Sequence, residues 1–347
     1  MSGVPQGSVL GQILFLVYIS DIAKDLTAST LVYVDDTKLR QCIKTEEDVE
    51  NMQKELEKLF TWGTNNNMEF NGSKFQVIRY GHNENIKNDT TYFTGDYHEI
   101  IERFSSLRDL GVQLHEDGTF RDHIENICKK ARQKCGWLFR SFYSRRPDFL
   151  KHMFNSLVQP HIDYCSQLWM PSEGQNLDKI EKVLKDFTKR LPGLKEHTYW
   201  ERLSILKMNS QQRRLERYQI IYMWKIIHGL VPNPGVNWSQ ESESGRNGRV
   251  AKIPQLKGKA SVKSLREQSF QVSGPRLFNC VPKDIRNMSK CGLEDFKLKL
   301  DHFLTEVPDE PKGEGLVPGA TNPFTGRPTN SLVQQVVRRV SSWNGHV

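Results

Sequence analysis

The sequence predicts an α+β fold at the amino-terminal end, followed by a mainly α-helical region. Over residues 9–80, apolar residues recur first at helical spacing and then in short β-type runs bounded by turn residues. From Phe120 onward helical spacing predominates, and lysine and arginine become abundant. We therefore expect helices on one face of a mainly antiparallel sheet, and then a basic helical region.

The first predicted elements are a helix and a hairpin. An apolar stripe after Ser8 is expected to place one face of a helix on a core, and Asp21 and Ile22 close that helix. The stripe consists of Leu10, Ile13, Leu14, Val17 and Tyr18. Leu31 to Val34 is predicted as a buried strand, and 38–43 as its return strand. The hairpin would carry Asp35 and Asp36 at its tip.

A second helix is predicted to begin at Thr45, because Thr45-Glu-Glu-Asp48 has the acidic, cap-forming character of a helix start. Its apolar stripe runs to Phe60, and the helix stops at the asparagines of 65–67. Residues 68–70 and 75–80 are then predicted as strands.

Further helices are predicted over 120–143, 148–158, 177–191, 199–206, 210–228 and within 269–304. The stretch from Val231 is rich in Gly, Ser, Asn and Lys, which is typical of a linker. The expected organisation is a sheet domain over 1–118, basic helices over 119–230, a linker over 231–268, a small helical unit over 269–304 and a disordered tail over 305–347.

Composition indicates a basic protein with reduced cysteines. The formal charge of +8 favours contact with a polyanion. The six cysteines include no C-x-x-C pair and no histidine at zinc-knuckle spacing, so reduced and mostly buried thiols are expected. The apolar run 13–19 lacks the flanks of a signal peptide, and no stretch is long enough for a membrane span. A soluble intracellular protein is expected, in the nucleus or the cytoplasm and of undetermined oligomeric state.

Two motifs carry candidate chemistry. Asp35 and Asp36 supply adjacent carboxylates at a strand end, and oxygen ligands of this kind suit Mg²⁺. Upstream, Gly3-Val-Pro-Gln-Gly7 leaves room for a template or nucleotide beside the backbone, and Gln6 offers an amide. Taken alone, the aspartate pair is more often a solvated Asp-Asp turn. The glycine string alone is weak evidence, because an ordinary helix-entry turn has the same pattern.

Together and in this order, the motifs resemble the centre of reverse transcriptases from LINE-type non-LTR retrotransposons, most closely jockey-like mobile elements. The resemblance implies RNA-directed DNA synthesis by two-metal catalysis, with Mg²⁺ or Mn²⁺ as cofactor and with RNA template, DNA primer and dNTPs as partners. Asp35 would be the direct metal ligand, Asp36 its support, and Gln6 and Gly7 would line the nucleotide site. Gln12 departs from the family, which usually has proline there.

Two further segments match the family in order. Lys74 takes the position of a lysine near the incoming triphosphate; a solvated lysine is the alternative. Residues 107–112 resemble the hairpin that grips the primer end, with Gly111 in a tight turn and Leu110 and Val112 packed beneath it. Without the family order this segment would be an ordinary β-hairpin.

The basic helix after Phe120 stands where these polymerases have a thumb. It could bind nucleic acid without sequence preference by neutralising phosphates, or its basic face could simply be solvated. The cations concerned are Lys129, Lys130, Arg132, Lys134 and Arg140.

The resemblance, which covers roughly residues 1–305, also implies a catalytic aspartate and fingers upstream of the glycine turn. These would lie before residue 3, so the expectation is a partial palm with thumb, inactive alone. The alternative is a non-catalytic nucleic-acid-binding remnant of a degraded or repurposed element. Such a remnant would need the basic helices and not the acids.

Overall fold

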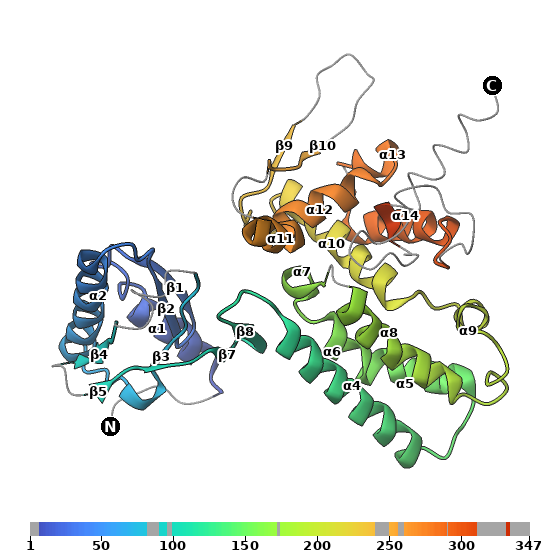
Figure 1. Cartoon of the computed structure of the whole chain (residues 1–347), viewed down its shortest axis with the longest axis horizontal. Coiled ribbons are helices and arrows are strands. Elements are labelled where there is room, and N and C mark those ends of the chain that lie inside the picture. Colours follow the sequence, from blue (N-terminus) through green and yellow to red (C-terminus); the bar gives the residue numbers. More distant parts are fainter. Residues whose placement is uncertain are drawn as a thin grey trace. The chain divides into compact units, whose positions relative to one another are not determined.

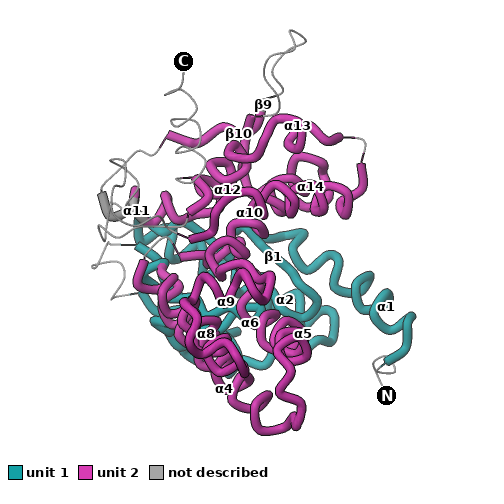
Figure 2. The backbone as a smooth tube through the Cα atoms, turned by 90° about the vertical axis from the view of Figure 1, so that its right-hand side faces the viewer, with its two compact units in different colours: residues 1–118 teal, residues 119–347 magenta. Residues whose placement is uncertain are grey.

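The structure is a computed structural model of the chain, which divides into two compact units. Unit 1 spans Met1–Gly118 and unit 2 spans Thr119–Val347 (Figure 2). The structure describes residues 7–81, 90–95, 99–171, 174–239, 250–255, 260–289, 291–310 and 331–333. Helices and short sheets occur together, which is compatible with the α+β class predicted from sequence.

Unit 1 combines helices with short strand pairs (Figure 1). Its helices are α1 (Val9–Ile19) and α2 (Glu46–Asn65), with a 3₁₀ turn at Gly72–Lys74. Its strands are β1 (Ser29–Tyr33), β2 (Asp36–Arg40), β3 (Gln76–Val77), β4 (Phe93–Thr94), β5 (Glu99–Ile100), β6 (Glu102–Arg103), β7 (Ser106–Asp109) and β8 (Val112–His115).

The described strands of unit 1 form separate pairs, whereas the sequence predicted one sheet. β1 pairs with β2, β4 with β5 and β7 with β8, all antiparallel, while β3 and β6 are parallel. The predicted strand over 68–70 is wrong, and that over 75–80 is reduced to β3. Aromatic side chains explain the difference, because Phe70 and Phe75 pack on α2 in place of extended pairing.

Helix α2 organises the interior of unit 1. The predicted cap is present: the Thr45 hydroxyl accepts from the Asp48 amide at 3.3 Å, and the Asp48 carboxylate accepts from the Thr45 amide at 2.9 Å. Leu59 packs with Ile19 and Ile22 in one apolar cluster, and Leu56 belongs to another. The carboxyl end of α1 and the strand β2 are thereby fixed to the same helix.

The predicted burial of α1 is wrong for most of its apolar stripe. The exposed fractions of its members lie between 42% and 68%, for Leu10, Ile13, Leu14, Val17 and Tyr18. The strand predicted as buried is exposed too, since Leu31 to Val34 range from 40% to 62%. Tyr18 contacts Trp62 of α2, and Phe15 and Ile19 pack with the cluster around Leu59. The periodicity therefore identified a shared face of which the described residues of this unit cover only the carboxyl-terminal part.

Unit 2 is mainly helical (Figure 1). Its first helices are α4 (Arg121–Ser141), α5 (Pro147–Leu157), α6 (Gln159–Asp163), α7 (Ser166–Trp169), α8 (Gly174–Lys189), α9 (Tyr199–Leu206) and α10 (Gln211–Ile227). The strands β9 (Asn237–Ser239) and β10 (Val250–Lys252) follow, and then α11 (Ala260–Gln268), α12 (Phe270–Asn279), α13 (Lys283–Arg286) and α14 (Leu293–Glu306).

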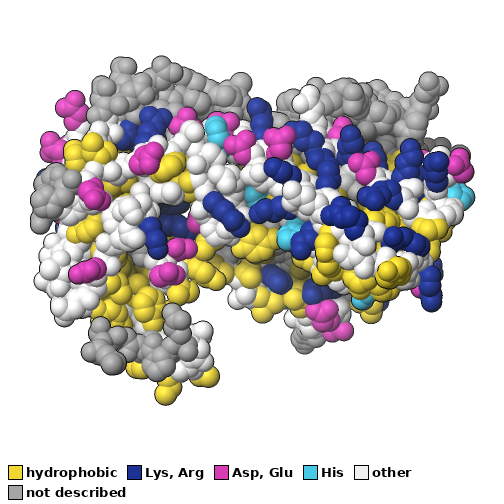
Figure 3. Space-filling model, turned by 90° about the horizontal axis from the view of Figure 1, so that it is seen from below, with side chains coloured by type: hydrophobic (Ala, Val, Ile, Leu, Met, Phe, Trp, Pro, Cys, Tyr) yellow, Lys and Arg dark blue, Asp and Glu magenta, His cyan; other side chains and the backbone are white. Residues whose placement is uncertain are grey.

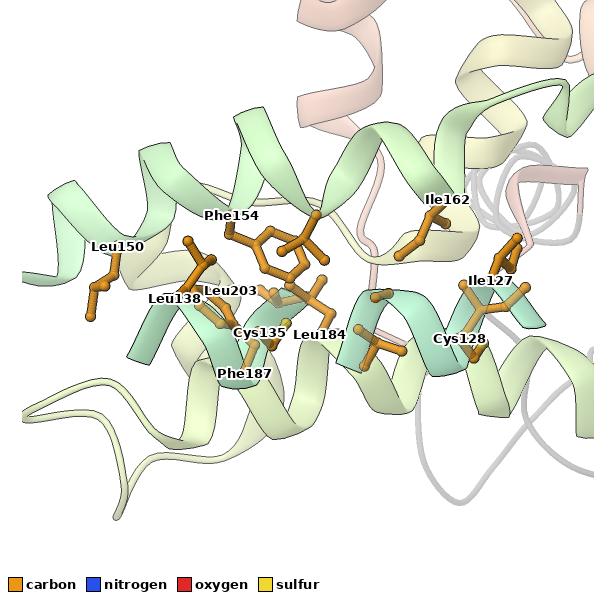
Figure 4. Close-up of a cluster of buried hydrophobic side chains, with 14 of the residues drawn as sticks. Ile127, Cys128, Cys135, Leu138, Leu150, Phe154, Ile162, Leu184, Phe187 and Leu203 are labelled. Atoms are coloured by element: carbon orange, nitrogen blue, oxygen red, sulfur yellow. The ribbon is translucent and has the colours of Figure 1, made fainter. Parts of the chain in front are cut away.

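The first core of unit 2 lies between α4, α5 and α8 (Figure 4). Leu138 and Phe154 are fully buried, and the ring of Phe154 stacks on that of Phe187 with 4.4 Å between centroids. Ile127 and Leu184 extend the same cluster along α4 and α8. This packing turns one face of α4 inward and leaves its basic face in solvent.

Part of the stretch expected as a linker belongs to a second core. β9 and β10 pair, and Val236 and Ala251 are each 2% exposed among side chains of α10, α12 and α14. The Asn279 side chain donates to the Ala251 carbonyl at 2.9 Å and accepts from its amide at 3.0 Å. The sequence did not predict the burial of Val236 and Ala251, because the stretch as a whole has a low apolar content.

Part of the stretch expected as a disordered tail also packs, on the first turn of α10. The Asp309 carboxylate accepts from the Ser210 amide and hydroxyl at 2.5 and 2.7 Å. Leu332 is fully buried, and its amide donates to Glu216 at 3.0 Å. Burial raises the pKa of Glu216 to about 7, although the positive charge of Arg213 acts to lower it. These contacts join residues about 100 positions apart, which no local pattern reports.

The structure also tests the expected burial of the cysteine thiols and the expected lack of a membrane span. Cys128 and Cys135 are buried, but Cys42 and Cys165 are exposed, so the expected burial of the thiols holds only in part. All six cysteines are free. Among the described residues, no helix combines the length and the apolar character needed to cross a membrane.

Candidate active site

The two adjacent carboxylates lie at the turn of the β1–β2 hairpin. Tyr33 faces Asp36 in the ladder, so Val34 and Asp35 form a two-residue turn. Val34 has φ +55°, a left-handed value that is strained for a β-branched residue. A positive φ at the first central residue is usual in type II′ hairpin turns, where glycine normally stands. The strain falls at the candidate site, as it often does where geometry matters for function.

Asp35 and Asp36 are both exposed, and neither carboxylate has a hydrogen bond or ion pair with any residue that the structure describes. Their oxygens are therefore accessible to a ligand. Asp35 lies in the turn and Asp36 begins β2, so the two carboxylates come from different parts of the hairpin. Among the described residues, no group of three or more His, Cys, Asp or Glu side chains could hold a metal ion. These two acids offer the oxygen ligands that Mg²⁺ prefers, but two carboxylates are fewer than such a site needs.

The glycine turn is described only from Gly7, and Gln6 lies outside the described residues. Gly7 has φ +84°, and a side chain added there would meet no atom of the described residues within 4 Å. The next residue, Ser8, caps α1 by accepting from the Gly11 amide at 3.1 Å. The backbone at Gly7 is therefore open to close approach by another molecule.

Lys74 is exposed at the end of the 3₁₀ turn, and the structure describes no bond between it and either carboxylate. The next residue, Phe75, packs in the cluster that also includes Leu39 of β2. Phe75 and Leu39 thus connect the segment that carries the lysine to the hairpin through one apolar cluster.

The predicted primer-grip hairpin is β7–β8. Leu110 and Gly111 form its turn with φ +42° and +88°, and Asp109 faces Val112. Val112 is 3% exposed and packs as predicted. Leu110 is 41% exposed, so its predicted burial is wrong, because its place in the turn directs it away from the core.

An ion pair joins the two hairpins. Lys38 of β2 lies 2.5 Å from the Asp109 carboxylate of β7, next to the Leu110–Gly111 turn. Two segments that the sequence placed in the candidate site are therefore brought together by the fold. Both side chains are partly exposed, so the pair contributes about 1 kcal/mol at most.

Glu55 is a positioning residue that the sequence reasoning missed. It is 3% exposed and accepts from the Thr27 amide at 2.6 Å, from the Ala28 amide at 3.0 Å and from Lys58 at 2.7 Å. These bonds fix the chain just before β1, and hence the hairpin that carries the acids. The one signal in the sequence was a carboxylate on the apolar face of α2, beside Leu56 and Leu59.

We predict that Glu55→Gln loosens the hairpin and changes its response to acid. Burial alone would raise the pKa of Glu55, but the bonds from Lys58, Ala28 and Thr27 outweigh it and lower the pKa to about 2. The ionised group therefore stabilises unit 1 fully above its ordinary pKa of 4.5, and this is lost as the pH falls toward 2. The loss on substitution at neutral pH should be on the order of 3 kcal/mol.

Amide hydrogen exchange with mass spectrometry, corrected for intrinsic rates at each pH, would measure the effect on peptides from β1 and β2. Peptides from α4 and α8 in unit 2 serve as the internal control. Unchanged protection of β1 and β2 in the variant would show that Glu55 does not position the hairpin.

A second candidate surface lies on α4 in unit 2. Ile124, Ile127, Ala131, Cys135 and Leu138 form its buried face. The five predicted cations, Lys129, Lys130, Arg132, Lys134 and Arg140, are all exposed. Lys and Arg side chains also crowd the surface of unit 2 seen in Figure 3. Such a surface attracts phosphates over several ångströms and loses affinity as salt rises.

Comparison with known proteins agrees with the motifs. Residues 1–114 match the family described as reverse transcriptase (RNA-dependent DNA polymerase). The chain is 25% identical over 206 residues to the RNA-directed DNA polymerase from mobile element jockey of Drosophila melanogaster, covering 55% of this chain and 22% of that protein. The corresponding polymerase of Drosophila funebris is 24% identical over 206 residues, which again cover 55% of this chain and 22% of that protein.

An uncharacterised protein of Caenorhabditis elegans is 22% identical over 131 residues, covering 37% of this chain and 64% of that protein. No solved structure matches the chain.

Residues 1–114 are thus similar to the reverse transcriptase family. Within that class the chain resembles the jockey-like polymerases of the LINE type, as the motifs predicted. The chain spans about a fifth of the length of the jockey polymerases that it matches.

Proposed function

We propose that this chain contributes to RNA-directed DNA synthesis by a mobile element, with Asp35 and Asp36 as metal ligands in nucleotidyl transfer. The observation that carries the proposal is the pair of accessible carboxylates at a strained hairpin turn, in a domain of the reverse transcriptase family. Bound Mg²⁺ or Mn²⁺ would stabilise the attacking and leaving oxygens of the transfer.

The remaining candidate residues take roles around this pair. Gly7 offers open backbone and Gln6 an amide to the incoming dNTP, and Lys74 a positive charge to its phosphates. The turn at Leu110–Gly111, tied to β2 through Lys38 and Asp109, lies beside the primer end. The RNA template and the DNA primer are the proposed partners, and the basic face of α4 contacts their phosphates.

Among the described residues, no group of three or more acidic, histidine or cysteine side chains could hold a metal ion. We therefore expect the 347-residue polypeptide not to extend a DNA primer on an RNA template with Mg²⁺ when it is assayed alone. Extension should appear when a complementary polypeptide supplies the upstream catalytic aspartate and the fingers of a jockey-like polymerase. Robust extension by the lone polypeptide would show that its own residues complete the site.

The alternative function is nucleic-acid binding without catalysis, which the exposed basic face of α4 favours. In that case the complementary polypeptide would restore no extension, while binding through α4 would persist. Primer extension with the complementary polypeptide therefore distinguishes catalysis from binding alone.

We predict that charge reversal on α4 weakens nucleic-acid binding. Lys130→Glu with Lys134→Glu should lower affinity for all sequences alike, because contacts to phosphates carry no sequence information. The salt dependence should also become shallower, by about 0.9 in the slope of log affinity against log salt for each phosphate of B-form DNA that the variant leaves without a cation. Fluorescence anisotropy over a salt series measures both quantities.

The matched control is Lys263→Glu with Lys299→Glu, which reverses two exposed lysines on α11 and α14. This control changes the net charge equally but leaves α4 intact. Equal losses of affinity in the two double variants would mean that only net charge matters and that α4 has no specific role.

A further inference from the structure

Unit 2 carries a basic hollow where α4 and α8 end, which is wide open to solvent and is called the cavity below. Its volume is about 720 Å³, and its lining includes Arg145, Lys189, Arg190 and Lys195 but no carboxylate. The acidic neighbours in the chain, Asp186 and Glu196, are exposed and do not belong to the lining. The cavity therefore concentrates positive charge.

Two of the four cations are held in place. Arg145 donates to the Phe139 carbonyl at 2.7 Å and to the Phe142 carbonyl, at the carboxyl end of α4. Arg190 lies over the ring of Phe139, with 3.9 Å between its guanidinium carbon and the ring centroid. These contacts involve carbonyls and a ring, so neither guanidinium charge is neutralised by them.

The helix dipoles account for only part of this charge. Arg145 and Lys189 lie at the carboxyl ends of α4 and α8, where a cation is favourable for the helix itself. Lys195 lies beyond the end of α8 and has no carboxylate partner among the described residues. The lining thus holds more cationic groups than the two helix ends require.

An exposed aromatic residue stands close to the cavity in the chain. Tyr143 is fully exposed in the loop between α4 and α5, two residues before Arg145. A tyrosine ring in water beside cations is the usual arrangement for binding single-stranded nucleic acid, in which an unpaired base stacks on the ring. A paired base in a duplex does not offer its face in this way.

We propose that the cavity binds a phosphate group of single-stranded nucleic acid, and that a neighbouring base stacks on Tyr143. This site deepens the nucleic-acid-binding part of the proposed function and rests on it, but it is separate from the basic face of α4. Arg145 and Arg190 suit the phosphate oxygens because a guanidinium can donate two parallel hydrogen bonds. Lys189 and Lys195 add charge at the rim.

Fluorescence anisotropy of the full chain with a labelled single-stranded RNA and with a duplex of the same sequence tests the proposal. Lys189→Glu with Lys195→Glu should weaken single-strand binding about tenfold or more and reduce its salt dependence. Tyr143→Ala should weaken it about tenfold, the range of losing one stacked base. Duplex binding should change much less in both variants. Circular dichroism checks that these surface variants remain folded.

Three outcomes would overturn the proposal: single-strand affinity equal to that of the wild type in both variants, equal losses for single strand and duplex, or no single-strand binding by the wild type. Competition by inorganic phosphate distinguishes the source of the ligand, since displacement at equal concentration would indicate a site for free phosphate instead. The α4 double variant separates this proposal from the proposed function. If that variant binds the duplex normally while the cavity variants lose the single strand, the cavity stands and the α4 role fails.

Discussion

Asp35→Asn should abolish primer extension by the assembly of this chain with the complementary polypeptide, with a loss of about 10³-fold or more. Asparagine keeps the shape of aspartate but carries no charge, so it binds a divalent cation far less well. The hairpin should stay folded, because the Asp35 carboxylate bonds to no other described residue. Extension on an RNA template at saturating Mg²⁺ measures the loss.

Asp25→Asn is the matched control, since Asp25 is an exposed aspartate of unit 1 outside the hairpin. It should leave extension unchanged. Co-purification of the two polypeptides shows whether the Asp35 variant still assembles. An assembled Asp35→Asn variant with normal activity would eliminate this residue as a metal ligand.

Phe154→Ala should cost unit 2 about 3–5 kcal/mol of stability, as is typical for removing a buried aromatic ring. Phe154 is fully buried, and its ring stacks on Phe187 in the core on which α4 packs. The vacated space cannot close easily, because the surrounding side chains come from several helices. Nucleic-acid binding should be lost at temperatures where the variant unfolds and the wild type does not.

Phe149→Ala on the same helix is the control, because Phe149 is only partly buried against Phe142. Denaturant unfolding, with hydrogen exchange of peptides from α4 and α8, compares the two variants. A cost below about 1 kcal/mol for Phe154→Ala would contradict the core described for unit 2.

The elements that the sequence predicted well are those with strong local signals. The capping box at Thr45 and the stripe that follows it indicated α2, and the apolar face of α4 was correctly separated from its basic face. These features repeat within a few residues, so periodicity and capping chemistry are enough to find them.

The features that could not be predicted from the sequence depend on residues that are far apart in the chain. Spacing in α1 indicated which residues share a face, but it could not report whether anything covers that face. Glu55 meets Thr27 across 28 positions, and Leu332 meets Glu216 across 116. The short β9–β10 pair is too small to produce a periodic signal.

The candidate site was predicted in part. The order of the motifs gave the family, and the structure adds the two-residue turn at Val34 and the ion pair from Lys38 to Asp109. Neither follows from composition or spacing, because the backbone angle of Val34 and the pairing of two separate hairpins are set by the fold.

The central claim is that Asp35 and Asp36 hold the catalytic metal, and iron-mediated cleavage tests it most directly. Fe²⁺ would replace Mg²⁺ in an assembly that extends primers, and ascorbate with peroxide would generate radicals at the bound ion. If the two carboxylates hold the ion, the backbone should be cut beside residues 34–36, and excess Mg²⁺ or the Asp35→Asn substitution should remove the cut. An active assembly with no cut near this hairpin would contradict the claim.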